Sequence, residues 1–141
     1  PMRLRTLFLL ASLTLPLAAC GDDEPSSAGE MHADGHMTRS ESGAYMLHPM
    51  ASDWAPTTGD HTVRFHLMND DGAVQASAMA VEPWMPDHGH GSSAVPEATD
   101  MGDGMWEVSR LVFTMPGAWE LRFDVTIDGQ AERFVMPVTV Q

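Results

Sequence analysis

The sequence holds an unusual number of side chains that bind soft metal ions. Twelve of its 141 residues are Met and seven are His, against a single Cys. The densest group lies in residues 84–92, where Met85, His88 and His90 supply one thioether and two imidazoles. Thioethers suit Cu(I) and imidazoles suit several transition metals, whereas structural zinc sites favour cysteine. The segment therefore predicts a copper site, with Cu(I) favoured over Cu(II).

The same segment has a backbone suited to positioning ligands. Two prolines restrict it and two glycines permit turns, so it needs no support from a helix or sheet. If the segment is extended, His88 and His90 point to the same side. Three later methionines are candidates to complete the site: Met101, Met105 and Met115.

Two further groups have ligand-like spacing and are predicted as secondary metal sites. The first comprises Met31, His32, His36 and Met37, and the second comprises Met46, His48 and Met50. The second group alternates, so its members share one face of an extended strand. The alternatives are a polar linker with incidental Met and His, and methionines that fill gaps in a core. Two isolated histidines, His61 and His66, are interpreted as solvated strand residues.

The first twenty residues are typical of a secretory signal peptide. A short basic start precedes an apolar run over residues 6–15, which is too short to span a bilayer. Leu17-Ala18-Ala19-Cys20 then resembles the bacterial lipobox, in which Cys20 would carry lipid and become the mature N-terminus. The alternative is an N-terminal core helix. We expect a signal peptide over residues 1–19 and a lipoprotein of the bacterial cell envelope, facing the periplasm or the exterior.

Residues 20–42 are predicted to be a flexible acidic linker, because they lack apolar periodicity. The whole chain has a net charge of −13, with seven Arg and no Lys. This charge excludes generic nucleic-acid binding, which needs a basic face. With Cys20 used as an anchor, the folded domain has no disulfide and depends on its core.

Residues 43–141 have the pattern of an all-β domain. Val63, Phe65 and Leu67 alternate with polar residues, apolar residues also alternate over 119–127, and Asp128-Gly129 is a strong hairpin signal. About seven short strands predict an immunoglobulin-like antiparallel β-sandwich, with a small closed barrel as the alternative.

Particular side chains of this domain are expected to pack in the core. Trp106 and Trp119 are predicted core anchors, and Met136 is predicted to face inward. We also expect a strand buried on both faces over residues 74–81. In the strand over 105–114, Trp106, Val108 and Val112 should share one face, and Leu111 and Phe113 the other.

The segment Met85-Pro86-Asp87-His88-Gly89-His90-Gly91 resembles the Met-Pro-x-His-Gly-His-Gly signature of FixH/YtkA-like domains. Residues 104–106 and 113–121 resemble the strands that follow it in that family, and the resemblance covers roughly residues 57–140. It implies an extracytoplasmic β-sandwich associated with copper handling or with assembly of membrane copper enzymes. It implies no catalytic residues, and the lipobox is not part of it.

These observations predict an envelope lipoprotein that binds copper and buffers it or delivers it to a partner. The alternative is a non-metal interaction module that uses the Pro/Gly-rich loop, residues 83–92, as a partner-binding edge. An enzyme is not expected, since no nucleophile triad, paired acids or nucleotide-binding loop stands out. A blue-copper site needs a Cys ligand, and Cys20 lies at the predicted terminus.

Overall fold

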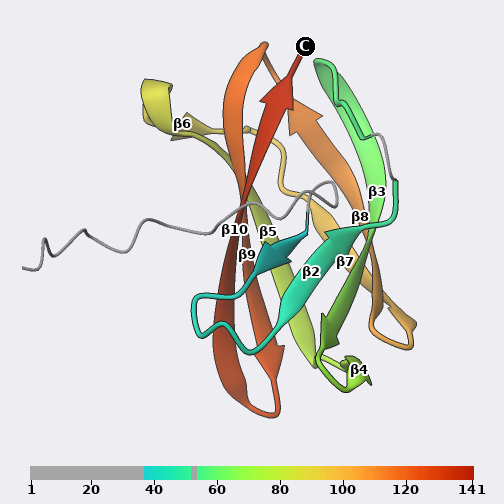
Figure 1. Cartoon of the computed structure of the whole chain (residues 1–141). Coiled ribbons are helices and arrows are strands. Elements are labelled where there is room, and N and C mark those ends of the chain that lie inside the picture. Colours follow the sequence, from blue (N-terminus) through green and yellow to red (C-terminus); the bar gives the residue numbers. More distant parts are fainter. Residues whose placement is uncertain (1–36, 52–53) are drawn as a thin grey trace, which may run out of the picture.

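The computed structural model describes residues 37–51 and 54–141, which form two antiparallel β-sheets packed face to face (Figure 1). The predicted all-β sandwich is confirmed. The predicted signal peptide, Cys20 and three of the linker ligands, Met31, His32 and His36, lie outside the described residues.

One sheet has six strands in the order β1-β2-β3-β8-β7, with β4 paired to β3. Its members are β1 (Thr38–Arg39), β2 (Met46–Pro49), β3 (Gly59–Asn69), β4 (Gly72–Ala73), β7 (Glu97–Gly102) and β8 (Met105–Phe113). The first strand begins at Thr38, before the predicted boundary at residue 43. Directly after it, Ser40 forms a β-bridge with Phe134 of the other sheet.

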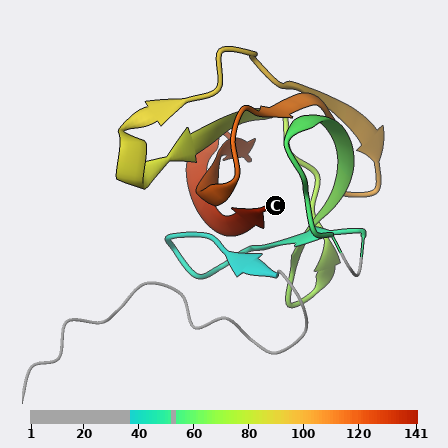
Figure 2. The ribbon, with the colours of Figure 1, turned by 90° about the horizontal axis from the view of Figure 1, so that it is seen from above.

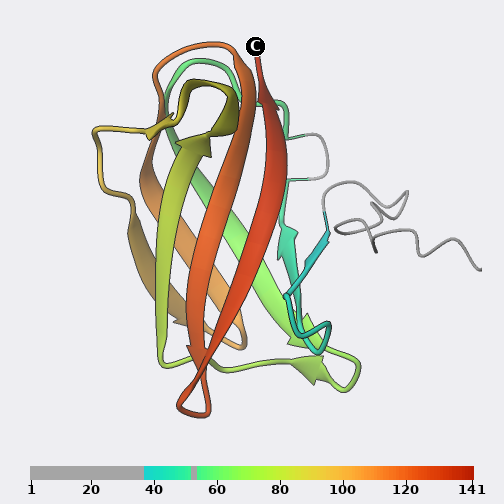
Figure 3. The ribbon, with the colours of Figure 1, turned by 90° about the vertical axis from the view of Figure 1, so that its left-hand side faces the viewer.

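The other sheet has four strands in the order β10-β9-β5-β6. Its members are β5 (Ala78–Met85), β6 (His90–Gly91), β9 (Gly117–Ile127) and β10 (Gln130–Val140), and a 3-10 turn η1 (Pro86–His88) joins β5 to β6. The predicted Asp128-Gly129 hairpin is confirmed, because β9 and β10 pair on both sides of it over their full lengths. The strands β5, β9 and β10 lie side by side in Figure 3.

The core lies between the sheets, whose strands enclose a common interior when seen from above (Figure 2). It follows the predicted alternation, since Val63, Phe65 and Leu67 are buried and so are the alternating apolar residues of β9 from Trp119 to Ile127 and of β10 from Phe134 to Val140. Trp119 is 1% exposed and Met136 is also 1% exposed, which confirms both as core residues. The interior is therefore filled by side chains from every long strand.

The predicted faces of β8 were wrong beyond its middle. Trp106 and Val108 are buried, but Leu111 and Phe113 are buried on the same side, and Val112 faces away from them. The cause is a register shift against β3, where Arg110 has a positive φ of 57°. One extra residue in a strand reverses the alternation that follows it.

The strand predicted over residues 74–81 was also misplaced. The strand β5 begins only at Ala78 and continues to Met85. Val74 and Ala76 are buried, but they belong to the connection before the strand. Within β5, Val81, Pro83 and Met85 are buried and the intervening residues are more exposed, so only one face of this strand packs in the core.

Candidate metal-binding sites

The loop after β5 positions His88 and His90 through a tight turn. Pro86 begins η1, where its fixed φ suits the first helical position. Gly89 ends the turn in the left-handed region, and its N–H donates to the carbonyl oxygens of Met85 at 3.0 Å and Pro86 at 3.2 Å. The chain reverses here, and His90 pairs with Met85. The segment is therefore a turn, as its prolines and glycines allow, and the condition under which His88 and His90 would alternate along one extended strand does not apply.

The turn nevertheless brings the two imidazole rings together. The ring centroids of His88 and His90 lie 5.7 Å apart with an interplanar angle of 67°. Two imidazoles bound to one ion at metal–nitrogen distances near 2 Å have centroids up to roughly 6 Å apart. The separation in this loop therefore suits two ligands of a single ion.

His90 is held by two neighbours. Its ring lies 6.4 Å from that of Trp119, edge to face, and its Nδ1 lies 3.1 Å from the carbonyl oxygen of Gly91. A neutral ring that donates from Nδ1 keeps its Nε2 lone pair for a metal. His90 is half-buried, whereas His88 is exposed, so the pair lies at the surface with one ring anchored against the core.

The two predicted thioethers at this end of the sandwich lie deeper. Met85 is 3% exposed and belongs to the core, and its Cε lies against Gly117 at the start of β9. Met115 lies just before that strand and packs partly buried against the core. Its carbonyl oxygen accepts a hydrogen bond of 3.0 Å from Nε1 of Trp119. Both sulfurs thus belong to side chains with a packing role.

Met101 and Met105 are not brought to this loop. They lie in the β7–β8 hairpin, while Met115 follows the opposite end of β8. At about 3.3 Å per residue, the nine residues of β8 separate its ends by roughly 26 Å. The hairpin and η1 accordingly lie at opposite ends of the sandwich (Figure 3).

Met105 instead joins the outward face of the six-stranded sheet. In this register His48 lies opposite His66, His66 lies opposite Met105, and Met46 lies opposite Met68. All five side chains are half-buried. His66 and Met68 were missed as candidates because only the pairing of distant strands brings them to the others.

Two predicted members of the secondary groups flank this face. Met50 is exposed just beyond β2, and its N–H donates to the carbonyl oxygen of Arg64 at 2.8 Å. Met37 is half-buried just before β1. Since Thr38 pairs with Leu47 and Arg39 with Met46, the same register continued by one residue places Met37 opposite His48.

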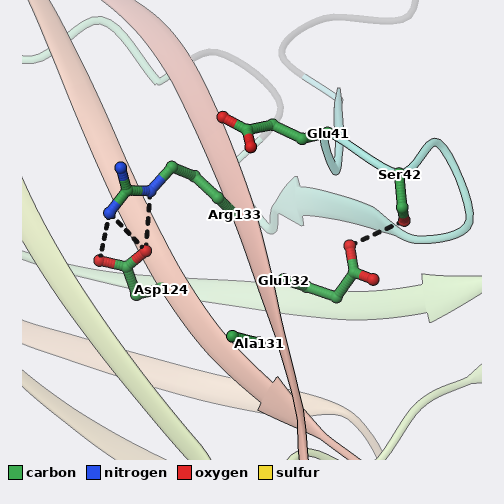
Figure 4. A pocket seen from close by; sticks show the side chains of 6 residues that line it. All are labelled: Glu41, Ser42, Asp124, Ala131, Glu132 and Arg133. Carbon is green, nitrogen blue, oxygen red and sulfur yellow. Dashed lines mark hydrogen bonds and ion pairs between the residues drawn. The ribbon is translucent and has the colours of Figure 1, made fainter.

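A separate open hollow lies between the turn after β1 and the β9–β10 pair (Figure 4). Arg133 donates to Asp124 from Nε at 2.8 Å and from Nη2 at 2.9 Å, while Ser42 donates to Glu132 at 2.7 Å. The hydrogen bond from Arg133 lowers the pKa of Asp124, burial opposes this, and the guanidinium charge adds to the lowering. These groups bind one another, and we assign them no ligand.

The other side chains that commonly bind metals do not cluster in the described residues. In residues 37–51 and 54–141, no three His, Cys, Asp or Glu side chains gather as a metal-binding group. The same part of the chain contains no helix long and apolar enough to cross a membrane.

Comparison with known proteins identifies the family. Neither a curated protein nor a solved structure matches the chain significantly. The family model described as YtkA-like matches residues 50–124, which include β3, the loop with His88 and His90, and most of β9. The expected family is thereby confirmed, and the chain belongs to the YtkA-like family.

Proposed function

We propose that this YtkA-like protein binds copper at the loop between β5 and β6, with His88 and His90 as its imidazole ligands. The observation that carries the proposal is the 5.7 Å separation of the two rings on a turn fixed by Pro86 and Gly89. One ring is anchored against Trp119, so the pair is partly preorganised.

Thioether from Met85 or Met115 would complete a soft ligand set for Cu(I). Met85 immediately precedes η1, and its backbone carbonyl oxygen accepts a hydrogen bond from the N–H of Gly89, which lies between the two histidines. Because the side chain of Met85 is buried, its sulfur would have to bind from the core side of the loop. Met115 is less buried than Met85, and its backbone carbonyl oxygen accepts the hydrogen bond from Nε1 of Trp119.

The proposed role is to buffer copper or to deliver it to a partner protein of the bacterial cell envelope, without catalysis. The lipobox at Cys20 supports attachment to a membrane by lipid, and the net charge of −13 gives no electrostatic attraction to an anionic bilayer. The exposed His88 makes the ion accessible to a partner at the end of the sandwich.

The test is an anaerobic Cu(I) titration of the purified protein against a competing chromophoric chelator. The double variant His88→Ala/His90→Ala should bind copper at the loop at least about tenfold more weakly. The matched control is His61→Ala, because His61 lies on β3 in the other sheet and its Nε2 is 2.7 Å from the carbonyl oxygen of Thr57.

If the double variant binds copper as the unmodified protein does at every site, the loop is not a copper site. Crosslinking through this loop to a partner in metal-free protein would then favour the other prediction, a partner-binding edge over residues 83–92.

A further inference from the structure

We propose that the outward face of the six-stranded sheet is a second Cu(I) site, formed by His48, His66 and Met105 with Met46 and Met68 beside them. This soft face, as we call these five residues, lies on a different sheet from the loop site. It does not depend on copper binding at the loop.

The soft face is built by strand register. The three ligands His48, His66 and Met105 occupy directly opposed positions on the neighbouring strands β2, β3 and β8. Directly opposed residues on one face have Cβ atoms about 4.5–5.5 Å apart. An ion above the central strand is therefore within reach of His66 from below and of the other two side chains from either side.

Two further methionines lie next to the three ligands. Met46 and Met68 are opposed on β2 and β3, two residues further along each strand. Two residues of a strand advance by roughly 7 Å, which the long thioether side chains can span toward the histidines. Imidazole and thioether together favour Cu(I) over hard cations.

Core packing does not account for these methionines. Their strand neighbours Leu47, Phe65, Leu67 and Trp106 are buried, and alternation places the soft face on the opposite side of the sheet. Methionines that fill gaps in a core would lie on the buried side, as Met136 does.

Two arginines border the soft face. Arg39 on β1 lies directly opposite Met46, is exposed, and donates from Nη1 to the carbonyl oxygen of Gly43 at 3.2 Å, so a positive charge lies beside the methionine end of the site and two residues from the level of the histidines. The nearest outward cation on β3 is Arg64, two residues along the strand from His66, and its Nε lies 3.0 Å from Oε2 of Glu107 on β8. Arg64 is thus paired with a carboxylate instead of presenting an unpaired positive charge. The five side chains are half-buried, so they are shielded yet reachable by an ion from solvent.

The test follows each site separately in the full protein. Cu(I) is titrated anaerobically against a chelator, and the methionine methyl groups are observed by NMR after ¹³C-methyl labelling. The unmodified protein should bind one equivalent more than His48→Ala/His66→Ala. Cu(I) should shift the methyl signals of Met46, Met68 and Met105 in the unmodified protein but not in that variant.

The controls separate this site from the loop. His61→Ala, on the same strand β3, should keep the full stoichiometry and all methyl shifts. His88→Ala/His90→Ala should lose only loop binding and leave the soft-face methyl shifts intact. Met105→Leu keeps side-chain volume, and should weaken soft-face binding at least about tenfold even if the double histidine variant fails to fold.

Two results would overturn the second site. One is unchanged copper stoichiometry in a folded His48→Ala/His66→Ala variant. The other is that the chemical shifts of the soft-face methyl groups do not change on addition of Cu(I) but do change with protein concentration. That result would make this face a contact between copies of the chain.

Discussion

The two candidate copper sites use the same side-chain types but hold them in different ways. At the loop, His88 and His90 are two residues apart, and a proline, a left-handed glycine and a core tryptophan fix them. On the soft face, His48, His66 and Met105 come from three strands, and only backbone pairing holds them in line.

This difference determines what each site depends on. The loop site depends on one turn and on packing beneath it, where Met85 contacts Gly117 and His90 contacts Trp119. The soft face depends on correct register between β2, β3 and β8, because a one-residue slip would turn its ligands toward the core. Local packing changes should therefore affect the loop, and changes to strand pairing should affect the soft face.

The largest expected effect separates packing from metal binding at the loop. Met85→Ala leaves a cavity in the core and should lower the free energy of unfolding by about 3 kcal/mol. Met85→Leu conserves volume and should cost less than about 1.5 kcal/mol. Urea denaturation measures both. If Met85→Leu keeps its Cu(I) affinity, Met85 only packs, whereas a loss of at least about tenfold makes its sulfur a ligand.

A smaller effect is expected at the turn that sets the soft face. A methyl group at Gly104 would lie 2.5 Å from the carbonyl oxygen of Leu67 and 3.1 Å from the backbone nitrogen of Val74. Gly104→Ala should therefore cost about 2 kcal/mol in thermal or urea unfolding. It should also weaken copper binding at the adjacent Met105 more than at the loop.

The matched control for this change is Gly129→Ala in the β9–β10 hairpin. Gly129 has nearly the same φ, 77° against 73° for Gly104, but a methyl group there meets nothing within 4 Å. It should cost about 1 kcal/mol for backbone strain alone. Equal costs at the two positions would show that the close contact at Gly104 is relieved without harm to the strand pairing.

The smallest effect concerns an ion pair that belongs to neither site. The pKa of Asp124 is lowered in the folded protein, chiefly by its hydrogen bond from Arg133. Its contribution to stability is therefore present above the unfolded pKa of about 3.9 and is lost as pH falls through the lower folded value. The effect should be small because both side chains are more than half exposed.

Urea midpoints of the unmodified protein and Asp124→Asn, measured between neutral and strongly acidic pH, check this. The unmodified protein should be slightly more stable above about pH 4, and the difference should vanish in stronger acid. Copper binding at neutral pH should be the same in both, and a change would connect this pair to one of the sites.

The sequence predicts correctly those elements whose signals lie in neighbouring residues. The alternation over residues 119–127 and the Asp128-Gly129 turn establish β9 and β10, because face and pairing are encoded in adjacent residues. The closeness of the His88 and His90 rings also follows from adjacent residues, because only Gly89 separates them. The proline and the glycines of this loop indicate a turn, but they do not show that Pro86–His88 forms a 3-10 turn that reverses the chain between β5 and β6.

The errors arise where distant segments meet. The register shift at Arg110 arises from the pairing of β8 with β3. No local sequence pattern shows that β8 has one residue more than β3 at this point. The grouping of His66 with His48 and Met105 also depends on register across three strands. Met105 was consequently assigned to the loop, although β8 carries it to the far end of the sandwich.

The sheet edges have a consequence for how these molecules behave at high local concentration. Among the described strands, β1 and β6 have two residues each, and β7 is irregular at its end near Met101. The long edge strand β10 contains Pro137 and is partly covered by the bridge from Ser40. Short, bulged, proline-bearing or covered edges resist strand addition between copies. Strand addition between copies is thus disfavoured at these edges, and the part of β5 before Trp84, which β6 does not pair, is the edge that stays open to it.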